Sequence, residues 1–145
     1  MYMMKNLTIL DNIVLPAAES KKSRESRQEK QERGEQLMRK MGIIEIADND
    51  INEVSGGQLQ RACICRSMMN RPKLLFADEP TGALDQTTGH EIMSILMRTA
   101  RQTGAAVVVV THDSNVAAFC DATVTMRDGR LSSPQQSQPT AGGAR

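Results

Sequence analysis

Apolar positions in the C-terminal half form two strand-like runs with a helix-like pattern between them. Residues 73–77 (KLLFA) and 105–110 (AAVVVV) are short apolar runs, which are typical of parallel strands buried on both faces. Between them, residues 87–103 predict an amphipathic helix that ends at Gly104. The apolar face of this helix holds Ile92, Ile95, Leu96 and Thr99. Strand, helix and strand in this order predict one right-handed crossover unit with parallel strands.

The N-terminal half has a less regular pattern. Residues 7–15 are apolar and β-branched and are ended by Pro16, and their pattern fits a short helix or a strand. Residues 17–41 carry dense mixed charge, which predicts a solvated pair of helices interrupted near Gly34. Acidic residues interleave with the basic cluster in this segment, which favours a solvated face over a nucleic-acid patch. The basic cluster consists of Lys21, Lys22, Arg24 and Arg27.

Two further segments carry clear start or turn signals. Ser55 is a typical N-cap for a helix that runs to about Asn70, because Pro72 prevents its continuation. Residues 123–131 predict a β-hairpin, because the Asp128-Gly129 pair at their centre favours a tight turn.

These elements predict an α/β fold whose parallel sheet core occupies the C-terminal part, together with an α-helical subdomain. We assign residues 1–72 to the helical subdomain, which ends in the helix opened by Ser55, and residues 73–131 to the sheet core. Residues 132–145 are rich in Pro, Gly, Ser and Gln and predict a disordered tail. Sheets usually have about four to six strands, so we expect the missing strands to belong to a segment upstream of Met1.

Composition narrows the cellular setting. A chain of 145 residues with a formal net charge of +1 is one domain by length and has no long-range attraction to nucleic acid. No run reaches the ~18–20 apolar residues of a membrane span, and the start of the chain lacks a signal-peptide pattern. The cysteines lack zinc-ligand spacing and indicate small buried apolar residues in a reducing compartment. They are Cys63, Cys65 and Cys120.

Polar side chains follow both predicted strands. The first strand runs into Asp78-Glu79 and the second into residues 111–113 (THD), and ligands of parallel sheets gather at these strand ends. Asp78 suits an outer-shell role on Mg²⁺, because this hard cation takes oxygen ligands and keeps several waters. Glu79 suits a general base that positions a water, and His112 suits a donor to a transferring phosphoryl oxygen. A solvated acidic turn and a structural histidine remain the alternatives.

The stretch VSGGQLQR, residues 54–61, opens a predicted helix with Ser-Gly-Gly. Unpaired N–H groups and the helix dipole favour an anion at such a start, so the stretch predicts a phosphate site. A Ser/His/Asp hydrolase is excluded, because the sequence has no G-x-S-x-G elbow.

Three segments, in order and at the usual separations, resemble the ATP-binding subunits of ABC transporters. VSGGQLQR resembles their signature motif, LLFADEPTGALD (74–85) their Walker B motif with D-loop, and VVVVTHD (107–113) their H-loop. The resemblance extends from residue 7 to about 131, and LTILDNIVLP resembles the segment that follows the Q-loop. ADEPTGALD and MRDGRL are similar to the lipoprotein-release, macrolide-efflux and antimicrobial-peptide-resistance group.

The resemblance implies a P-loop NTPase-like core that uses ATP and Mg²⁺. In such a core, Asp78 would assist Mg²⁺, Glu79 would polarise the attacking water, and His112 would sense the γ-phosphate. Asp85 would cross the dimer interface, and residues 7–53 would dock on a membrane permease. The signature residues would contact ATP bound to the opposing subunit, and they are Ser55, Gly56, Gly57 and Gln58.

The sequence departs from the family pattern at the P-loop, the segment that binds the phosphates of the nucleotide. It contains no G-x-x-x-x-G-K-[ST] pattern, and the Q-loop glutamine would fall just before Met1. We therefore expect an N-terminally truncated subunit that neither binds nor hydrolyses ATP alone.

The function that we expect is that of an ATP-hydrolysing subunit of an ABC exporter, peripheral on the cytoplasmic face of the cell membrane. Its partners would be a permease and a second ATP-binding subunit, and no nucleic acid. The alternative is a non-catalytic interaction module that lends its signature helix to a partner ATPase. An ABC-type ATPase of DNA repair or chromosome maintenance is disfavoured, because no sustained heptads appear.

Overall fold

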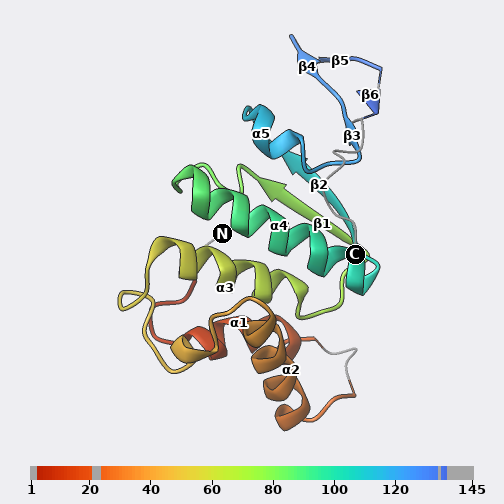
Figure 1. The fold of residues 1–145 in the computed structure, drawn as a ribbon. Helices are drawn as coiled ribbons and strands as arrows, with labels where there is room; N and C mark the ends of the chain where they lie inside the picture. Colours follow the sequence, from red (N-terminus) through yellow and green to blue (C-terminus); the bar gives the residue numbers. More distant parts are fainter. Residues whose placement is uncertain (1–2, 21–23, 134, 137–145) are drawn as a thin grey trace, which may run out of the picture.

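The structure is a computed structural model that describes residues 3–20, 24–133 and 135–136. Helices α1 and α2 lie at one end of the molecule, and α3 and α4 lie between them and the parallel sheet (Figure 1). The helices are α1 (Ile9–Ala18), α2 (Arg27–Lys40), the 3₁₀ helix η1 (Ile44–Ile46), α3 (Gly56–Met68), α4 (Gln86–Thr103) and α5 (Ser114–Ala117). The strands are β1 (Leu74–Asp78), β2 (Ala106–Val110), β3 (Ala122–Thr123), β4 (Met126–Arg127), β5 (Arg130–Leu131) and β6 (Gln135–Gln136).

The ambiguous apolar stretch after residue 7 is the helix α1. The Thr8 hydroxyl accepts the Asp11 N–H at 3.1 Å and so caps the helix start. The prediction that Pro16 ends this segment is wrong, because Pro16 lies inside α1. The Glu19 N–H still donates to the Leu15 carbonyl at 3.1 Å, so the helix continues past the proline to Ala18.

The predicted interruption near Gly34 is also wrong, because α2 runs unbroken through this residue. Gly34 is buried, and a Cβ there would lie 2.8 Å from Val14 Cγ2 and 3.0 Å from Leu10 Cδ1. Gly34 therefore lies where α2 crosses close to α1. Its missing side chain lets the two helices approach each other, and α2 is not broken there.

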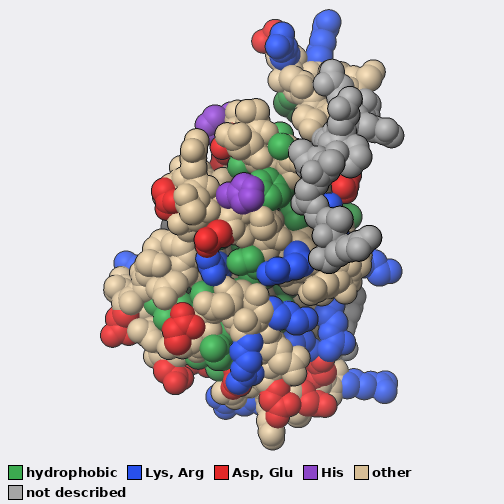
Figure 2. Space-filling view, viewed as in Figure 1, with side chains coloured by type: hydrophobic (Ala, Val, Ile, Leu, Met, Phe, Trp, Pro, Cys, Tyr) green, Lys and Arg blue, Asp and Glu red, His purple; other side chains and the backbone are tan. Residues whose placement is uncertain are grey.

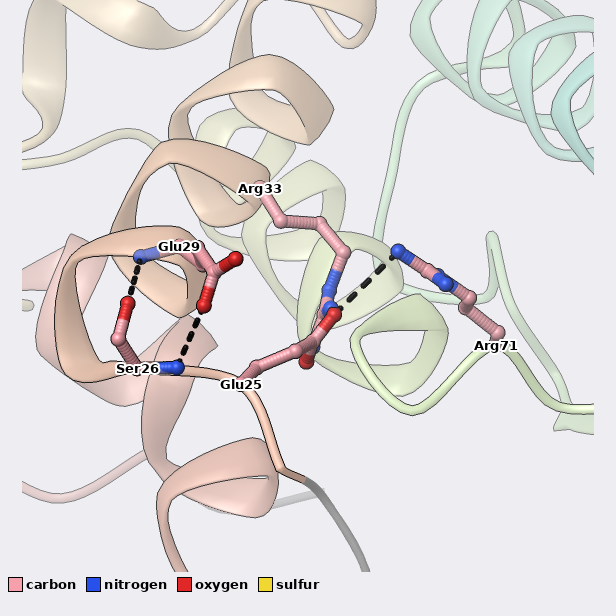
Figure 3. Close-up of polar contacts among 5 residues, drawn as sticks. All are labelled: Glu25, Ser26, Glu29, Arg33 and Arg71. Carbon is pink, nitrogen blue, oxygen red and sulfur yellow. Dashed lines mark hydrogen bonds and ion pairs between the residues drawn. The ribbon is translucent and has the colours of Figure 1, made fainter.

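Ionic contacts join α2 to the segment between α3 and β1 (Figure 3). The Glu25 carboxylate pairs with the Arg33 guanidinium and lies 3.4 Å from Arg71 Nη2. Beside this pair, Ser26 and Glu29 form a reciprocal capping box at the start of α2. Acidic and basic side chains are interspersed over this end of the molecule, as the sequence predicts for a solvated face (Figure 2).

The parallel sheet consists of β1 and β2, paired in register from Leu74 opposite Ala106 to Asp78 opposite Val110. The predicted parallel pairing is confirmed, and so is the amphipathic helix α4, which is capped by Gly104. The prediction that both strands are buried on both faces is wrong for this chain. Alternate side chains are exposed on one face of the sheet, and they are Leu74, Phe76, Val108 and Val110. α4 packs against β2, and among the described residues no element covers the face of these four side chains.

The predicted hairpin around Asp128-Gly129 is confirmed. β4 pairs antiparallel with β5, and the φ angles of Asp128 (48°) and Gly129 (73°) are both positive, as in a type I′ turn. β6 pairs antiparallel with β3. The predicted disordered tail lies mostly outside the described residues, and so do Lys21 and Lys22 of the basic cluster.

Candidate functional site

The carboxylate of Glu79 and the ring of His112 meet where β1 and β2 end. His112 Nδ1 lies 2.7 Å from Glu79 Oε1, and the His112 backbone N–H donates to the same oxygen at 3.0 Å. The parallel register explains this meeting, because Asp78 pairs with Val110 and each strand then delivers its next residues to one edge. The structure therefore brings together the two residues that the sequence predicts to be catalytic.

Glu79 and His112 shift each other's protonation. The hydrogen bond from His112, supported by one from Thr111, holds the pKa of the Glu79 carboxyl below its ordinary value. The same hydrogen bond and the negative charge of Glu79 raise the pKa of the His112 imidazole. Both chain histidines are exposed, and histidine side chains are visible on the face in Figure 2. The lowered pKa keeps the Glu79 carboxyl ionised at neutral pH, which is the form that the predicted general base requires.

Thr111 is a site residue that the sequence reasoning did not single out. Its hydroxyl donates to Glu79 Oε2 at 3.1 Å and accepts the Asp113 N–H at 3.1 Å. Both carboxylate oxygens of Glu79 are therefore held from the segment after β2. The register signals this role, because the residue after Val110 must lie opposite the residue after Asp78.

The signature stretch starts α3 with a capping box. The Ser55 hydroxyl accepts the Gln58 N–H at 3.2 Å, and the Gln58 side chain accepts the Ser55 N–H at 2.9 Å. Among the hydrogen bonds of the described residues, the N–H groups of Gly56 and Gly57 have no acceptor. Ser55 and Gly56 are exposed, so these N–H groups and the positive end of the helix dipole fit a phosphate oxygen.

Asp85 lies at the start of α4, beside the start of α3. Its carboxylate accepts the Thr88 N–H at 3.0 Å, and hydrogen bonds from Thr88 hold the pKa of this carboxyl below its ordinary value. A Cβ on Gly57 would lie 3.0 Å from Thr88 Cγ2, so the two helix starts are in close contact. The structure places Asp85 as a helix cap next to the signature stretch, and its predicted role across a dimer interface stays a prediction.

Asp78 is exposed at the end of β1. Mg²⁺ usually keeps several waters and takes one or two carboxylates together with substrate phosphates, so a single carboxylate here fits the ion that the sequence predicts. Among the described residues, no group of three or more His, Cys, Asp and Glu side chains forms a metal site of its own. The side chain that would hold the ion is therefore Asp78, with the remaining ligands supplied by nucleotide and water.

The cysteines fit the structural interpretation. Cys65 is buried, and burial raises the pKa of its thiol to about 12. Cys63 and Cys120 are half-buried, and burial raises the pKa of each thiol as well.

No helix in the part of the chain that the structure describes is long and apolar enough to cross a membrane.

The chain is similar to many curated proteins, among them the following three. It is 37% identical to the macrolide export ATP-binding/permease protein MacB of Mannheimia succiniciproducens, over 92% of this chain and 20% of that protein. It is 37% identical to the bacitracin export ATP-binding protein BceA of Halalkalibacterium halodurans, over 89% of this chain and 50% of that protein. It is 37% identical to the lipoprotein-releasing system ATP-binding protein LolD 1 of Caulobacter vibrioides, over 91% of this chain and 56% of that protein. The chain thus spans between a fifth and a little over half the length of these relatives.

Solved structures confirm the fold. The dimeric post-hydrolysis state of the ATP-binding cassette MJ0796 bound to ADP and Pi matches with a TM-score of 0.80 and 34% identity, over 94% of this chain and 59% of that one. CbiO1 from Clostridium perfringens, part of the complex cbiONQ, matches with a TM-score of 0.83 and 25% identity, over 93% of this chain and 53% of that one. The fold is therefore the α/β, P-loop NTPase-like fold of ABC cassettes, as the sequence predicts.

The family model of ABC transporters matches residues 2–82, which include the signature stretch and the Asp78-Glu79 pair. Together with the relatives named above, this match confirms the predicted group of ATP-binding proteins. The chain belongs to the ABC transporter family.

Proposed function

We propose that this chain works in an ATP-hydrolysing subunit of an ABC exporter and powers translocation through a permease. The observation that carries the proposal is the Glu79 carboxylate, held on both oxygens by Thr111 and His112 at the edge where β1 and β2 end. This edge is where parallel sheets bind ligands. Relatives named for macrolide, bacitracin and lipoprotein export support the transport class.

The residues of the site divide the chemistry between them. The ionised Glu79 carboxylate orients the attacking water, and a lowered pKa keeps it charged at neutral pH. The raised pKa favours the protonated His112 ring, in which Nδ1 donates to Glu79 and the exposed Nε2 would donate to a phosphoryl oxygen. Mg²⁺ neutralises charge on the phosphates when it is bound, and Asp78 is the carboxylate that would hold it.

The signature stretch supplies a second phosphate contact, which we assign to the nucleotide of a facing subunit. The N–H groups of Gly56 and Gly57, with the Ser55 hydroxyl, would donate to γ-phosphate oxygens, and Gln58 and Asp85 would lie at the same interface. The 145 residues contain no P-loop pattern, so the cradle of the nucleotide beside Glu79 would lie outside them, and the nucleotide that faces the signature stretch would be held by the P-loop of the partner. The dimeric MJ0796 cassette supports a two-subunit arrangement. The complex would sit on the cytoplasmic face of the cell membrane, with residues 7–53 on the permease.

Phosphate release tests this proposal. The chain is purified alone and together with an ABC ATPase subunit of the same genome that carries a complete P-loop. We expect no turnover by the chain alone, and turnover by the mixture above that of the partner alone. Ser55→Arg should abolish the increase, and Gln36→Glu on the exposed side of α2 should leave it unchanged. Glu79 serves the site whose P-loop lies outside these residues, so Glu79→Gln is tested with a P-loop segment fused ahead of residue 1, where it should abolish turnover at that site. Turnover by the chain alone that vanishes in Glu79→Gln would contradict a composite site, in which this chain and a P-loop-bearing partner each supply part of the contacts to ATP.

The same assay separates the second candidate, a non-catalytic module that only lends its signature helix. The observation that favours it is the lack of a P-loop pattern in the 145 residues, beside an intact capping box at Ser55. In that case Ser55→Arg abolishes the increase in phosphate release, and Glu79→Gln has no effect. Equal turnover with and without the chain would contradict both candidates.

A further inference from the structure

Gln60, in the second turn of α3, is bonded to the turn that carries Glu79. Its Nε2 donates to the Pro80 carbonyl at 2.7 Å, across twenty positions of the sequence. Pro80 is buried, and Gln60 is half-buried. A short hydrogen bond in a partly desolvated place joins the helix of the signature stretch to the residue directly after the proposed base.

The turn at Glu79 needs support from outside. Glu79 has a φ of 43°, a left-handed conformation that a residue with a side chain adopts only at a cost in free energy. Its N–H donates to the Val110 carbonyl at 2.9 Å, and its carbonyl accepts the Gly82 N–H at 3.2 Å. Val110 and the donors to the Glu79 carboxylate come from β2 and the segment after it, so Gln60 is the anchor on the other side, from α3.

α3 itself is fixed in place next to this anchor. Arg61 Nη1 donates to the Met41 carbonyl at 3.1 Å, and Nη2 lies 2.9 Å from Glu91 Oε2 on α4. The close approach of Gly57 to Thr88 fixes the same end of the helix against α4. The start of α3 is therefore bonded to α4 and to the residue that follows α2, and Gln60 joins the Glu79 turn to this helix.

We propose that Gln60 is a positioning residue, which sets the Glu79–Pro80 turn relative to the start of the signature helix. This inference rests on the proposed function, because the hydrogen bond from Gln60 to Pro80 matters for hydrolysis only if Glu79 takes part in it. The signature stretch faces one nucleotide of the dimer and Glu79 serves the other. A bond between α3 and the Glu79 turn therefore holds the two half-sites of one subunit at a fixed spacing.

Amide hydrogen exchange in the full chain tests the link without any nucleotide. Gln60→Met keeps the length of the side chain and removes the donor, Gln60→Lys restores a donor, and Gln36→Met on α2 is the matched control. We expect Gln60→Met to speed exchange of the Glu79 and Gly82 amides about fivefold to tenfold, as the loss of one hydrogen bond implies. Exchange in α1 should stay unchanged, and Gln60→Lys should restore most of the protection. Unchanged exchange at Glu79 and Gly82, or equal acceleration throughout the chain, would overturn the inference.

Steady-state kinetics of the complex with the P-loop-bearing partner then separate this inference from the proposed function. Gln60→Met should lower kcat severalfold with KM unchanged, and Gln60→Lys should recover part of the loss. Faster exchange with unchanged kcat would overturn Gln60 as a positioning residue. No turnover by the complex of the unaltered chain would contradict the proposed function, whereas the exchange result would still decide whether Gln60 holds the turn.

Discussion

The helices α1–α3 and the sheet β1–β2 differ in how far they bury their apolar side chains. The helical layer buries its own, with Ile9, Ile13 and Met38 fully enclosed. The sheet leaves Phe76 76% exposed and Val110 58% exposed, although its strands are as apolar as any in the chain. Parallel strands with this composition are normally covered on both faces. The comparison teaches that an apolar strand is suited to burial on both faces. Whether it is buried depends on which elements are present to cover it.

The largest expected difference is between two truncations to alanine, one in each region. Ile13→Ala should lower the free energy of unfolding by roughly 2–5 kcal/mol, because it leaves a cavity among enclosed side chains. Phe76→Ala should change it by less than about 0.5 kcal/mol, because the ring is mostly exposed. Urea denaturation of the purified chain measures both, and a cost at Phe76 similar to that at Ile13 would show that the sheet face is covered in solution.

Gly34→Val tests the close crossing of α1 and α2. The added side chain would press on Val14 and Leu10, so we expect a loss of about 1–3 kcal/mol in the free energy of unfolding. Gln36→Val places the same side chain at an exposed position of the same helix, so it is the control. Helix propensity alone would favour Gly34→Val over Gln36→Val, because glycine is a poorer helix former than valine and glutamine a better one. Similar denaturation midpoints for the two variants would contradict a close crossing at Gly34.

Ser55→Ala removes the cap at the start of α3, where the helical layer meets the proposed site. We expect a loss of about 1 kcal/mol in the free energy of unfolding, because the Gln58 N–H loses its acceptor. Ser55→Asp keeps an acceptor and should retain most of the stability. If Ser55→Ala and Ser55→Asp denature alike, the capping box contributes little to the fold.

The smallest effect is expected at the exposed Glu79–His112 pair, where pH is the probe. His112 has a raised pKa, so its contribution to stability is complete below the ordinary pKa of histidine and is lost as pH rises through the raised value. Glu79 has a lowered pKa, so its contribution is complete above the ordinary pKa of glutamate and is lost as pH falls through the lowered value. The pair is therefore intact between the two ordinary values.

An NMR titration of the His112 ring measures the raised pKa directly. We expect its midpoint above that of a free histidine, and Glu79→Gln should bring it back toward the ordinary value. A His112 midpoint that does not respond to Glu79→Gln would contradict the contact at the strand ends.

The sequence predicted the parts of the molecule that depend on local signals. Ser55 marked the start of α3, the Asp128-Gly129 pair marked the hairpin turn, and the strand ends placed Glu79 beside His112. It failed at Gly34, where the close packing of α2 on α1 overrides the local preference of glycine. It also failed at Pro16, which lies inside α1 and does not end it. Thr111 and Gln60 were missed, because their partners lie far along the chain and follow only from the register and the packing of α3.

The most direct test of the composite site is the NMR signal of the Gly56 and Gly57 amides. These N–H groups are the proposed donors to the γ-phosphate of a nucleotide held by a facing P-loop-bearing subunit. With a partner whose own catalytic glutamate is replaced by glutamine, which should bind ATP without hydrolysis, we expect both amides to shift when ATP, Mg²⁺ and the partner are all present. ATP and Mg²⁺ without the partner should leave both signals in place. Shifts that need no partner, or unchanged amides beside an ATP-loaded partner, would contradict the account.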